Sequence, residues 1–180
     1  MSEKVPFEQF LFRTAFCVIA CDGHIDNREI DEIKKLAATT SFFRKINVEE
    51  ELHRLLQSVR LEGRNIFTKF LDELGERDCD VVQELMVLEI VLRMIYVDTK
   101  LEINELKLTH LIRSKLKVAD EVIFQRFGAV DVLLGDRKLF DTLEASQTRV
   151  PEFTGIGGSD EEFRSLDVDW DHLDRSESDL

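Results

Sequence analysis

The chain of 180 residues has the length of one ordinary domain with an extension, and 43% of its residues are hydrophobic, which is ample for a packed core. Eight Gly and two Pro provide few turn signals, so the composition favours long helices over an architecture of many strands. The formal net charge of −13 argues against direct nucleic-acid binding, because neutralising phosphates requires clustered Lys and Arg.

The sequence indicates a soluble, cytoplasmic protein. No apolar run approaches the roughly 20 residues that a membrane span requires. The N-terminal stretch MSEKVPFEQF is acidic and aromatic, whereas a secretory signal begins with basic residues and continues with apolar ones. The three Cys show no disulfide-framework spacing, which agrees with a reducing compartment.

Hydrophobic periodicity predicts helices along most of the chain and no strands. Residues 6–21 and 79–97 are apolar on nearly every side, which is typical of central, buried helices. Asn47 is the expected N-cap of an amphipathic helix, and Gly75 is expected to end the next one as its C-cap. The predicted helices are residues 6–21, a helix from about 26, a helix over 48–59, and then 65–74, 79–97, 104–116, 120–127 and 129–145.

A change in composition separates a helical domain, residues 1–148, from an acidic tail, residues 149–180. From Pro151 to the last residue there are ten acids and two Arg, a net charge of −8. Such a segment has too little apolar surface to fold alone, so we expect a flexible acidic C-terminal tail.

Apolar residues in the tail recur at spacings of three, four and three, which would line one face of a helix that docks in a groove. The docking surface would belong to a protein partner or to the body of this chain, where Arg126 and Arg137 offer a basic rim. The alternative is a solvated tail without a partner. The partner-binding residues in this hypothesis are Phe163, Leu166, Trp170 and Leu173.

The stretch CDGHIDNRE, residues 21–29, matches the second half of a calcium-binding EF-hand loop. The first half is missing, because Val18 and Ala20 stand where Asp or Asn would be needed. A loop with half its ligands does not enclose calcium, so the match needs another explanation. The matching residues are Asp22, Gly23, Ile25 and Glu29.

The same pattern occurs a second time, 76 residues further along the chain. This offset aligns Asp22 with Asp98 and Glu29 with Glu105, and it also aligns the apolar residues around them. Each copy consists of a buried helix, the pattern Asp-x-x-[Ile/Leu]-x-x-x-Glu, and an amphipathic helix. The repeat predicts a duplicated helical bundle with the two buried helices packed together at its centre.

This duplicated motif resembles the TerB-like family, which is named for bacterial tellurite-resistance proteins. The likeness covers roughly residues 6–145, with Cys21 inserted before the first Asp and Thr99 in place of Gly in the second copy. The resemblance implies an all-α duplicated bundle and an acidic surface that binds a divalent metal such as calcium. The residues that carry the likeness are Ala20, Asp22, Gly23, Ile25, Glu29, Asp98, Leu101 and Glu105, and the implied metal ligands are Asp22, Glu29, Asp98 and Glu105.

Local structure offers a second explanation for these acids. Asp26 and Glu29 have the spacing of a capping box, in which Glu29 needs no metal. Asp22 and Asp98 follow helix C-termini, where a carboxylate is unfavourable by ~0.3–1 kcal/mol. Each therefore needs a compensating partner, which could be a backbone N–H of the turn, a Lys or Arg of a neighbouring helix, or a cation.

No catalytic constellation is present in the sequence. There is no nucleophile elbow, P-loop or dinucleotide fingerprint, and Cys17, Cys21 and His24 lack the fourth ligand of a zinc site. His53 and His110 lie on the polar sides of amphipathic helices, where we expect them to face solvent.

We therefore interpret the chain as a non-catalytic interaction or adaptor module of a bacterial stress-response or defence system. It would bind a protein partner through its acidic surface and its tail, which allows association with a membrane-bound complex. Two alternatives remain, a divalent-metal-responsive module and a metal-dependent enzyme that uses Asp22, Glu29 and Glu105 as paired carboxylates.

Overall fold

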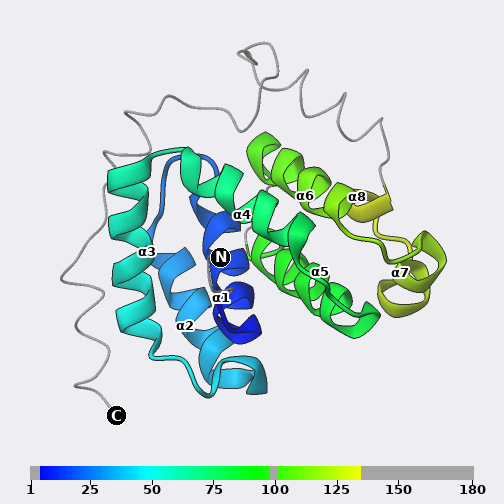
Figure 1. The fold of residues 1–180 in the computed structure, drawn as a ribbon, viewed down its shortest axis with the longest axis horizontal. Coiled ribbons are helices and arrows are strands. Elements are labelled where there is room, and N and C mark those ends of the chain that lie inside the picture. The colour runs from blue at the N-terminus through cyan, green and yellow to red at the C-terminus, as the bar shows by residue number, and fades with distance from the viewer. Residues whose placement is uncertain (1–4, 98–100, 135–180) are drawn as a thin grey trace.

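The structure, a computed structural model, describes residues 5–97 and 101–134, in which helices are joined by short turns and loops and there is no strand (Figure 1). The all-α fold predicted from the sequence is therefore confirmed. The helices are α1 (Phe7–Ala20), α2 (Asn27–Thr39), the 3₁₀ helix η1 (Ser41–Phe43), α3 (Val48–Glu62), α4 (Asn65–Glu76), α5 (Val81–Ile95), α6 (Ile103–Lys115), α7 (Asp120–Phe127) and α8 (Asp131–Leu134).

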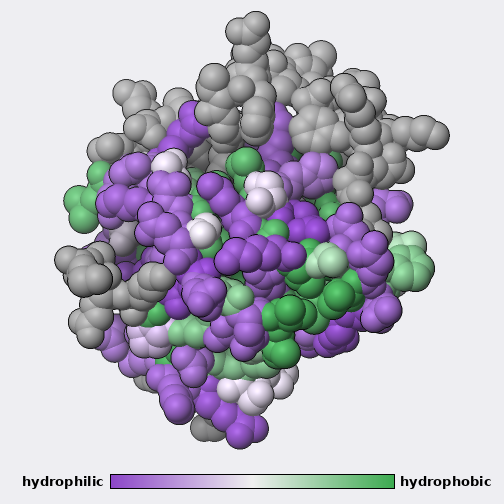
Figure 2. All heavy atoms as spheres, turned by 45° about the vertical axis from the view of Figure 1, so that its right-hand side comes forward, coloured by the Kyte–Doolittle hydropathy of each residue, from purple (hydrophilic) through white to green (hydrophobic). Residues whose placement is uncertain are grey.

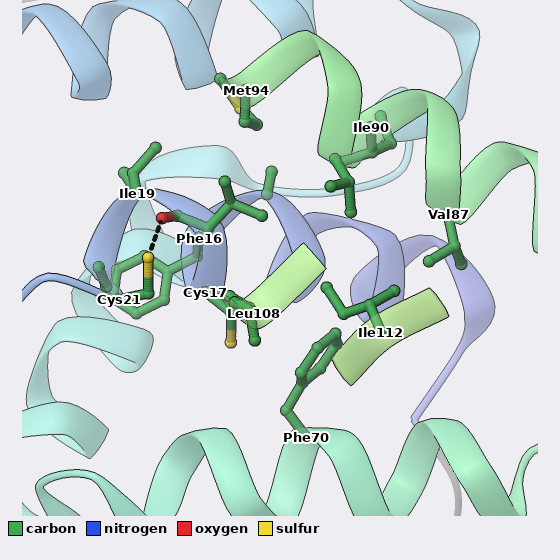
Figure 3. Packing of buried hydrophobic residues seen from close by; sticks show 14 of the residues in the cluster. Phe16, Cys17, Ile19, Cys21, Phe70, Val87, Ile90, Met94, Leu108 and Ile112 are labelled. Carbon is green, nitrogen blue, oxygen red and sulfur yellow. Dashed lines mark hydrogen bonds between the residues drawn. The ribbon is translucent and has the colours of Figure 1, made fainter. Parts of the chain in front are cut away.

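Helix α1 forms the centre of the bundle, because almost every side chain from Phe10 to Ala20 is buried. It packs most extensively against α5 and also contacts η1, α2, α3, α4 and α6. Figure 3 shows labelled side chains of α1, α4, α5 and α6 pointing into one common core. The predicted packing of the two all-round apolar helices against each other is thus confirmed.

An ionic network fixes α4 beside the start of α1. The Arg13 guanidinium donates to the Glu73 carboxylate at 2.7 Å. Arg77 donates to Glu73 at 2.5 Å and to the Val5 carbonyl at 2.9 Å, and its guanidinium lies 4.5 Å from the centre of the Phe10 ring. Because these groups are largely sheltered from water, the network holds the ends of the two helices in register.

Of two helix ends predicted from the sequence, one is confirmed and the other is wrong. Asn47 is the N-cap of α3, since its side-chain oxygen accepts a hydrogen bond from the Glu50 N–H at 3.3 Å. Gly75 was expected to be a C-cap, but this prediction is wrong, because α4 continues to Glu76. A Cβ atom at Gly75 would lie 3.3 Å from Cδ of Lys115, so the glycine instead permits a close approach of α6.

Some predictions concern residues outside the described ranges. These are Asp98, the acidic tail 149–180, and the part of the predicted helix 129–145 beyond Leu134. Within the described ranges, none of the helices has both the length and the apolarity to cross a membrane. The tail residues outside the described ranges include Phe163, Leu166, Trp170 and Leu173.

The fully buried Phe16 gives a direct test of the central packing. Replacing Phe16 with Ala leaves a cavity in the core around α1, so we expect the free energy of unfolding to fall by ~3–5 kcal/mol. Chemical denaturation measures this change. The control is Leu61→Ala on α3, where the side chain is 75% exposed and the expected change is within ~0.5 kcal/mol. Similar effects of the two substitutions would contradict the central position of α1.

His110 is half-buried rather than solvent-facing, which corrects the expectation from the helix pattern. Burial lowers its pKa from the ordinary 6.5, and a hydrogen bond with the backbone of Val132 in α8 opposes this shift. Just below pH 6.5 the unfolded chain therefore binds more protons at this position than the folded chain does, so folding becomes less favourable as the pH falls.

We expect wild type to lose more of its free energy of unfolding than His110→Gln when the pH is lowered from about 7.5 to about 5.5. Urea denaturation of both proteins at both pH values measures the difference, and the shared carboxylates cancel in the comparison. An equal loss in the two proteins would show that the imidazole is not kept neutral by folding.

Candidate functional site

The first candidate site is the turn after α1, which holds the first copy of the repeated motif. The helix ends at Ala20, and Gly23 adopts a φ of 82°, a left-handed conformation that favours glycine. Asp22 accepts a hydrogen bond from the His24 N–H at 2.8 Å. A backbone N–H of the turn is therefore one compensating partner of this carboxylate, as one of the three sequence-based alternatives proposed.

The electrostatics of Asp22 link the two copies of the motif. Partial desolvation raises the pKa of Asp22, the His24 N–H lowers it, and the nearby Glu102 carboxylate raises it further. Glu102 precedes α6 just as Asp26 precedes α2. The start of α6 therefore lies near the turn that leads from α1 into α2.

The two motif glutamates have the same structural role. Glu29 accepts the Asp26 N–H at 2.9 Å, and Asp26 in turn accepts the Glu29 N–H at 3.0 Å, which completes the predicted capping box. In the second copy, Glu105 accepts the Glu102 N–H, also at 2.9 Å. The repeat in sequence therefore corresponds to a repeated way of starting a helix.

Cys21 lies between these carboxylates but is buried. Its thiol donates to the Val18 carbonyl at 3.0 Å, as the dashed line in Figure 3 shows. Burial raises the pKa of Cys21 well above its ordinary value, and Glu105, Asp22 and Glu29 raise it further. A thiol in this environment stays protonated, which suits core packing and not metal ligation or nucleophilic attack.

A metal assignment for the motif residues stays a prediction. Within residues 5–97 and 101–134, no three His, Cys, Asp or Glu side chains are grouped in a way that could hold a metal ion. Asp22, Glu29 and Glu105 lie near one thiol, and each accepts a backbone N–H. The fourth predicted ligand, Asp98, lies outside the described residues.

The second candidate site depends on where α7 is held. The buried Glu84 of α5 accepts the backbone N–H groups of Lys117 and Val118, at 2.8 Å and 2.5 Å. Hydrogen bonds from backbone N–H groups to a carboxylate are charge-assisted and strong. This contact anchors the connection between α6 and α7 onto α5, so it fixes the position of α7 relative to α5.

An open groove of about 420 Å³ lies between the last turns of α5 and α7 and the segment before α8, and we call it the α5–α7 groove. Tyr96, the residue that follows α5, is 62% exposed and lies beside three other apolar residues of the lining, so its ring is part of an apolar surface and does not stand alone. In Figure 2, which turns this side of the molecule forward, apolar side chains gather among hydrophilic ones. The apolar residues that line the groove are Leu92, Tyr96, Phe127 and Val130.

The charged lining of the α5–α7 groove is positive. Arg93 and Arg126 both donate to the Glu89 carboxylate, at 2.7 Å and 2.9 Å, so two cations share one anion. The two guanidinium side chains remain 47% and 54% exposed. Each arginine also lies in the last turn of its helix, where its charge offsets the helix macrodipole. A positive rim therefore occurs in a chain whose net charge is strongly negative.

Sequence reasoning identified Arg126 as a basic residue but missed the groove. Leu92 and Tyr96 belong to a stretch that is apolar on all sides, so the periodicity gave no sign that one edge is open. One signal in the sequence could have indicated the groove. The single Tyr directly follows a buried helix, and a Tyr side chain, with its apolar ring and polar hydroxyl, is suited to a binding surface.

No protein-family model matches the chain, and neither a curated protein nor a solved structure shows significant similarity to it. The resemblance to the TerB-like family therefore rests on the motif residues alone and remains a proposal.

Gln and Ala substitutions at Glu29 distinguish a cap from a metal ligand. A capping box needs only an acceptor oxygen, which Gln retains, so Glu29→Gln should be less destabilising than Glu29→Ala, for which we expect a loss of about 1 kcal/mol. Chemical denaturation with a chelator, and again with calcium, magnesium, manganese or zinc, measures both. Glu105→Gln and Glu105→Ala repeat the same test in the second copy of the motif.

With a capping role, added metal should not change the difference between Gln and Ala variants. A divalent ion that stabilises wild type but neither variant would contradict the capping role and support the metal assignment, because a ligand set depends on the carboxylate charge.

Proposed function

We propose that this chain is a non-catalytic protein-interaction module, and that its α5–α7 groove binds an acidic, amphipathic helix of a partner protein. The observation that carries the proposal is an exposed apolar groove whose charged residues carry a net positive charge. An amphipathic helix would place its apolar face in such a groove and its acids against the rim.

The composition of the groove supports a protein ligand. Tyr and Arg are enriched among the residues that contribute most to protein–protein affinity, and the groove has Tyr96 at one wall with Arg93 and Arg126 beside it. Phe127 adds an aromatic surface on α7, with the Arg126 guanidinium 5.3 Å from its ring centre. Aromatic and guanidinium groups together suit an apolar helix face that is bordered by carboxylates.

The chemistry of the groove favours binding over catalysis. Among the described residues that line it, Glu89 is the one carboxylate, and each of its oxygens accepts a hydrogen bond from a guanidinium. Such a carboxylate is a weak candidate for a general base, because both of its oxygens already bind guanidinium groups and neither is left for a substrate proton.

A second candidate is a divalent-metal-responsive module. The observation behind it is that Asp22, Glu29 and Glu105, from both copies, lie near one thiol, that of Cys21, although the described residues group no three such side chains in a way that could hold a metal ion. In that proposal, binding of a metal ion would change the affinity of the chain for a partner. A related alternative is a metal-dependent enzyme that uses the same carboxylates. The resemblance to the TerB-like family would place either form in a bacterial stress-response or defence system.

A displayed library of random peptides, with the full chain as bait, tests the proposed function. We expect the enriched peptides to carry acids together with apolar residues at helical spacing of three and four. Binding of a selected peptide, measured by calorimetry, should weaken at least tenfold in Tyr96→Ala and in Arg126→Glu, because each removes part of the apolar or charged contact.

Arg60→Glu is the matched control. Arg60 is an exposed arginine of α3, on the opposite side of the bundle from α7 (Figure 1), so its reversal changes the net charge equally without touching the groove. The proposal fails if selection yields no acidic amphipathic peptides, or if the groove variants bind a selected peptide as wild type does.

A further inference from the structure

We infer that residues 160–174 of this same chain dock in the α5–α7 groove and act as an intramolecular latch that a partner helix must displace. The inference rests on the proposed function, because it assigns a regulator to the same groove. It joins a surface that the structure describes to a segment whose sequence has the matching chemistry.

The charge of the segment is complementary to the groove. Residues 160–174 contain seven acids and one Arg, a net charge of −6 with His172 neutral. The rim offers two half-exposed guanidinium groups that, among residues 5–97 and 101–134, pair with one shared carboxylate, that of Glu89. Acids beside the apolar face of a docked helix would form further ion pairs with Arg93 and Arg126. Because the docked helix would shield these pairs partly from water, each would be stronger than a fully exposed pair.

The apolar pattern of the segment also fits. Phe163, Leu166, Trp170 and Leu173 recur at intervals of three, four and three, which places them on one face of a helix. The groove presents apolar side chains from two walls, and on one of them Leu92 of α5 and Tyr96, which follows α5, are one turn apart. A two-walled apolar groove accepts a single helical ridge, as in other helix-in-groove complexes.

The chain is long enough to make the contact within one molecule. The described residues end at Leu134, one short helix beyond Val130, which itself lines the groove. The 28 residues between Leu134 and Phe163 can span about 90 Å when extended, so reach does not limit docking.

The latch would also set the strength of partner binding. For an effective concentration of about 1 mM and a docking Kd of about 0.1 mM, closed molecules outnumber open ones about tenfold. A partner helix would then bind about tenfold more weakly to the full chain than to a chain with a disabled latch.

Two unique fluorophores allow a direct test. The chain has one Tyr and one Trp, and Tyr96 lies in the groove while Trp170 lies in the proposed latch. In the docked full chain we expect energy transfer from Tyr96 to Trp170, with Trp170 emission shifted to the blue. In Trp170→Phe, which removes the acceptor but keeps an aromatic anchor, Tyr96 emission should recover.

Variants of the groove and of the latch test the contact from both sides. Arg126→Glu and the double variant Phe163→Asp, Leu166→Asp should each abolish the transfer and the blue shift, and Arg60→Glu should change neither. Positions 163 and 166 lie outside the described helices, so the double Asp variant leaves those helices unchanged in sequence. Circular dichroism checks that Arg126→Glu keeps the helical content of wild type. The transfer should not depend on protein concentration, since a concentration-dependent signal would mean docking into a second copy and would overturn the latch.

Binding of a selected acidic peptide separates this inference from the proposed function. The latch predicts that Phe163→Asp, Leu166→Asp binds the peptide about tenfold more tightly than wild type does. If transfer is absent from wild type, or if it persists unchanged in Arg126→Glu, the latch is refuted. In that event, loss of peptide binding in Tyr96→Ala would still uphold the proposed function. If transfer behaves as expected but no peptide binds, the groove serves the tail alone and the proposed function fails.

Discussion

The burial of α1 is the constraint on which the rest of the structure depends. A helix whose residues from Phe10 to Ala20 are almost all inaccessible to water must have neighbours on every side. The chain provides them with α5, α6, α4, η1, α2 and α3, so the bundle is arranged around one helix and not in a layer. The turn at the end of α1 is held by this packing, which is why Asp22, Glu29 and Glu105 all lie near Cys21.

Much of this arrangement could be predicted because its signals are local. All-round apolarity marked α1 and α5 as central, and the spacing of Asp26 and Glu29 marked a capping box that the structure contains. The second copy was visible through Glu105, which accepts the N–H of Glu102 as Glu29 accepts that of Asp26. Periodicity and capping depend on residues within one or two turns, so the sequence alone is enough to identify them.

The features that the sequence did not predict depend on contacts between distant elements. Gly75 looks like a helix terminator, yet its lack of a side chain serves the approach of Lys115 from α6. The α5–α7 groove exists because Glu84 binds the backbone at Lys117 and Val118 and thereby sets α7 beside the end of α5. Nothing within α5 distinguishes its open edge from its buried faces, so only the position of α7 reveals Tyr96 as part of a surface.

Cys17 of α1 and Cys21, the residue that follows α1, allow the opening of the bundle to be timed. Cys17 and Cys21 are completely buried, and burial raises the pKa of Cys17 to about 12, so neither thiol can react while α1 keeps its neighbours. Cys79, at the start of the segment before α5, is only partly covered and supplies an internal reference for the reagent itself. The delay between modification of Cys79 and modification of Cys17 and Cys21 therefore measures how long the centre of the molecule stays closed.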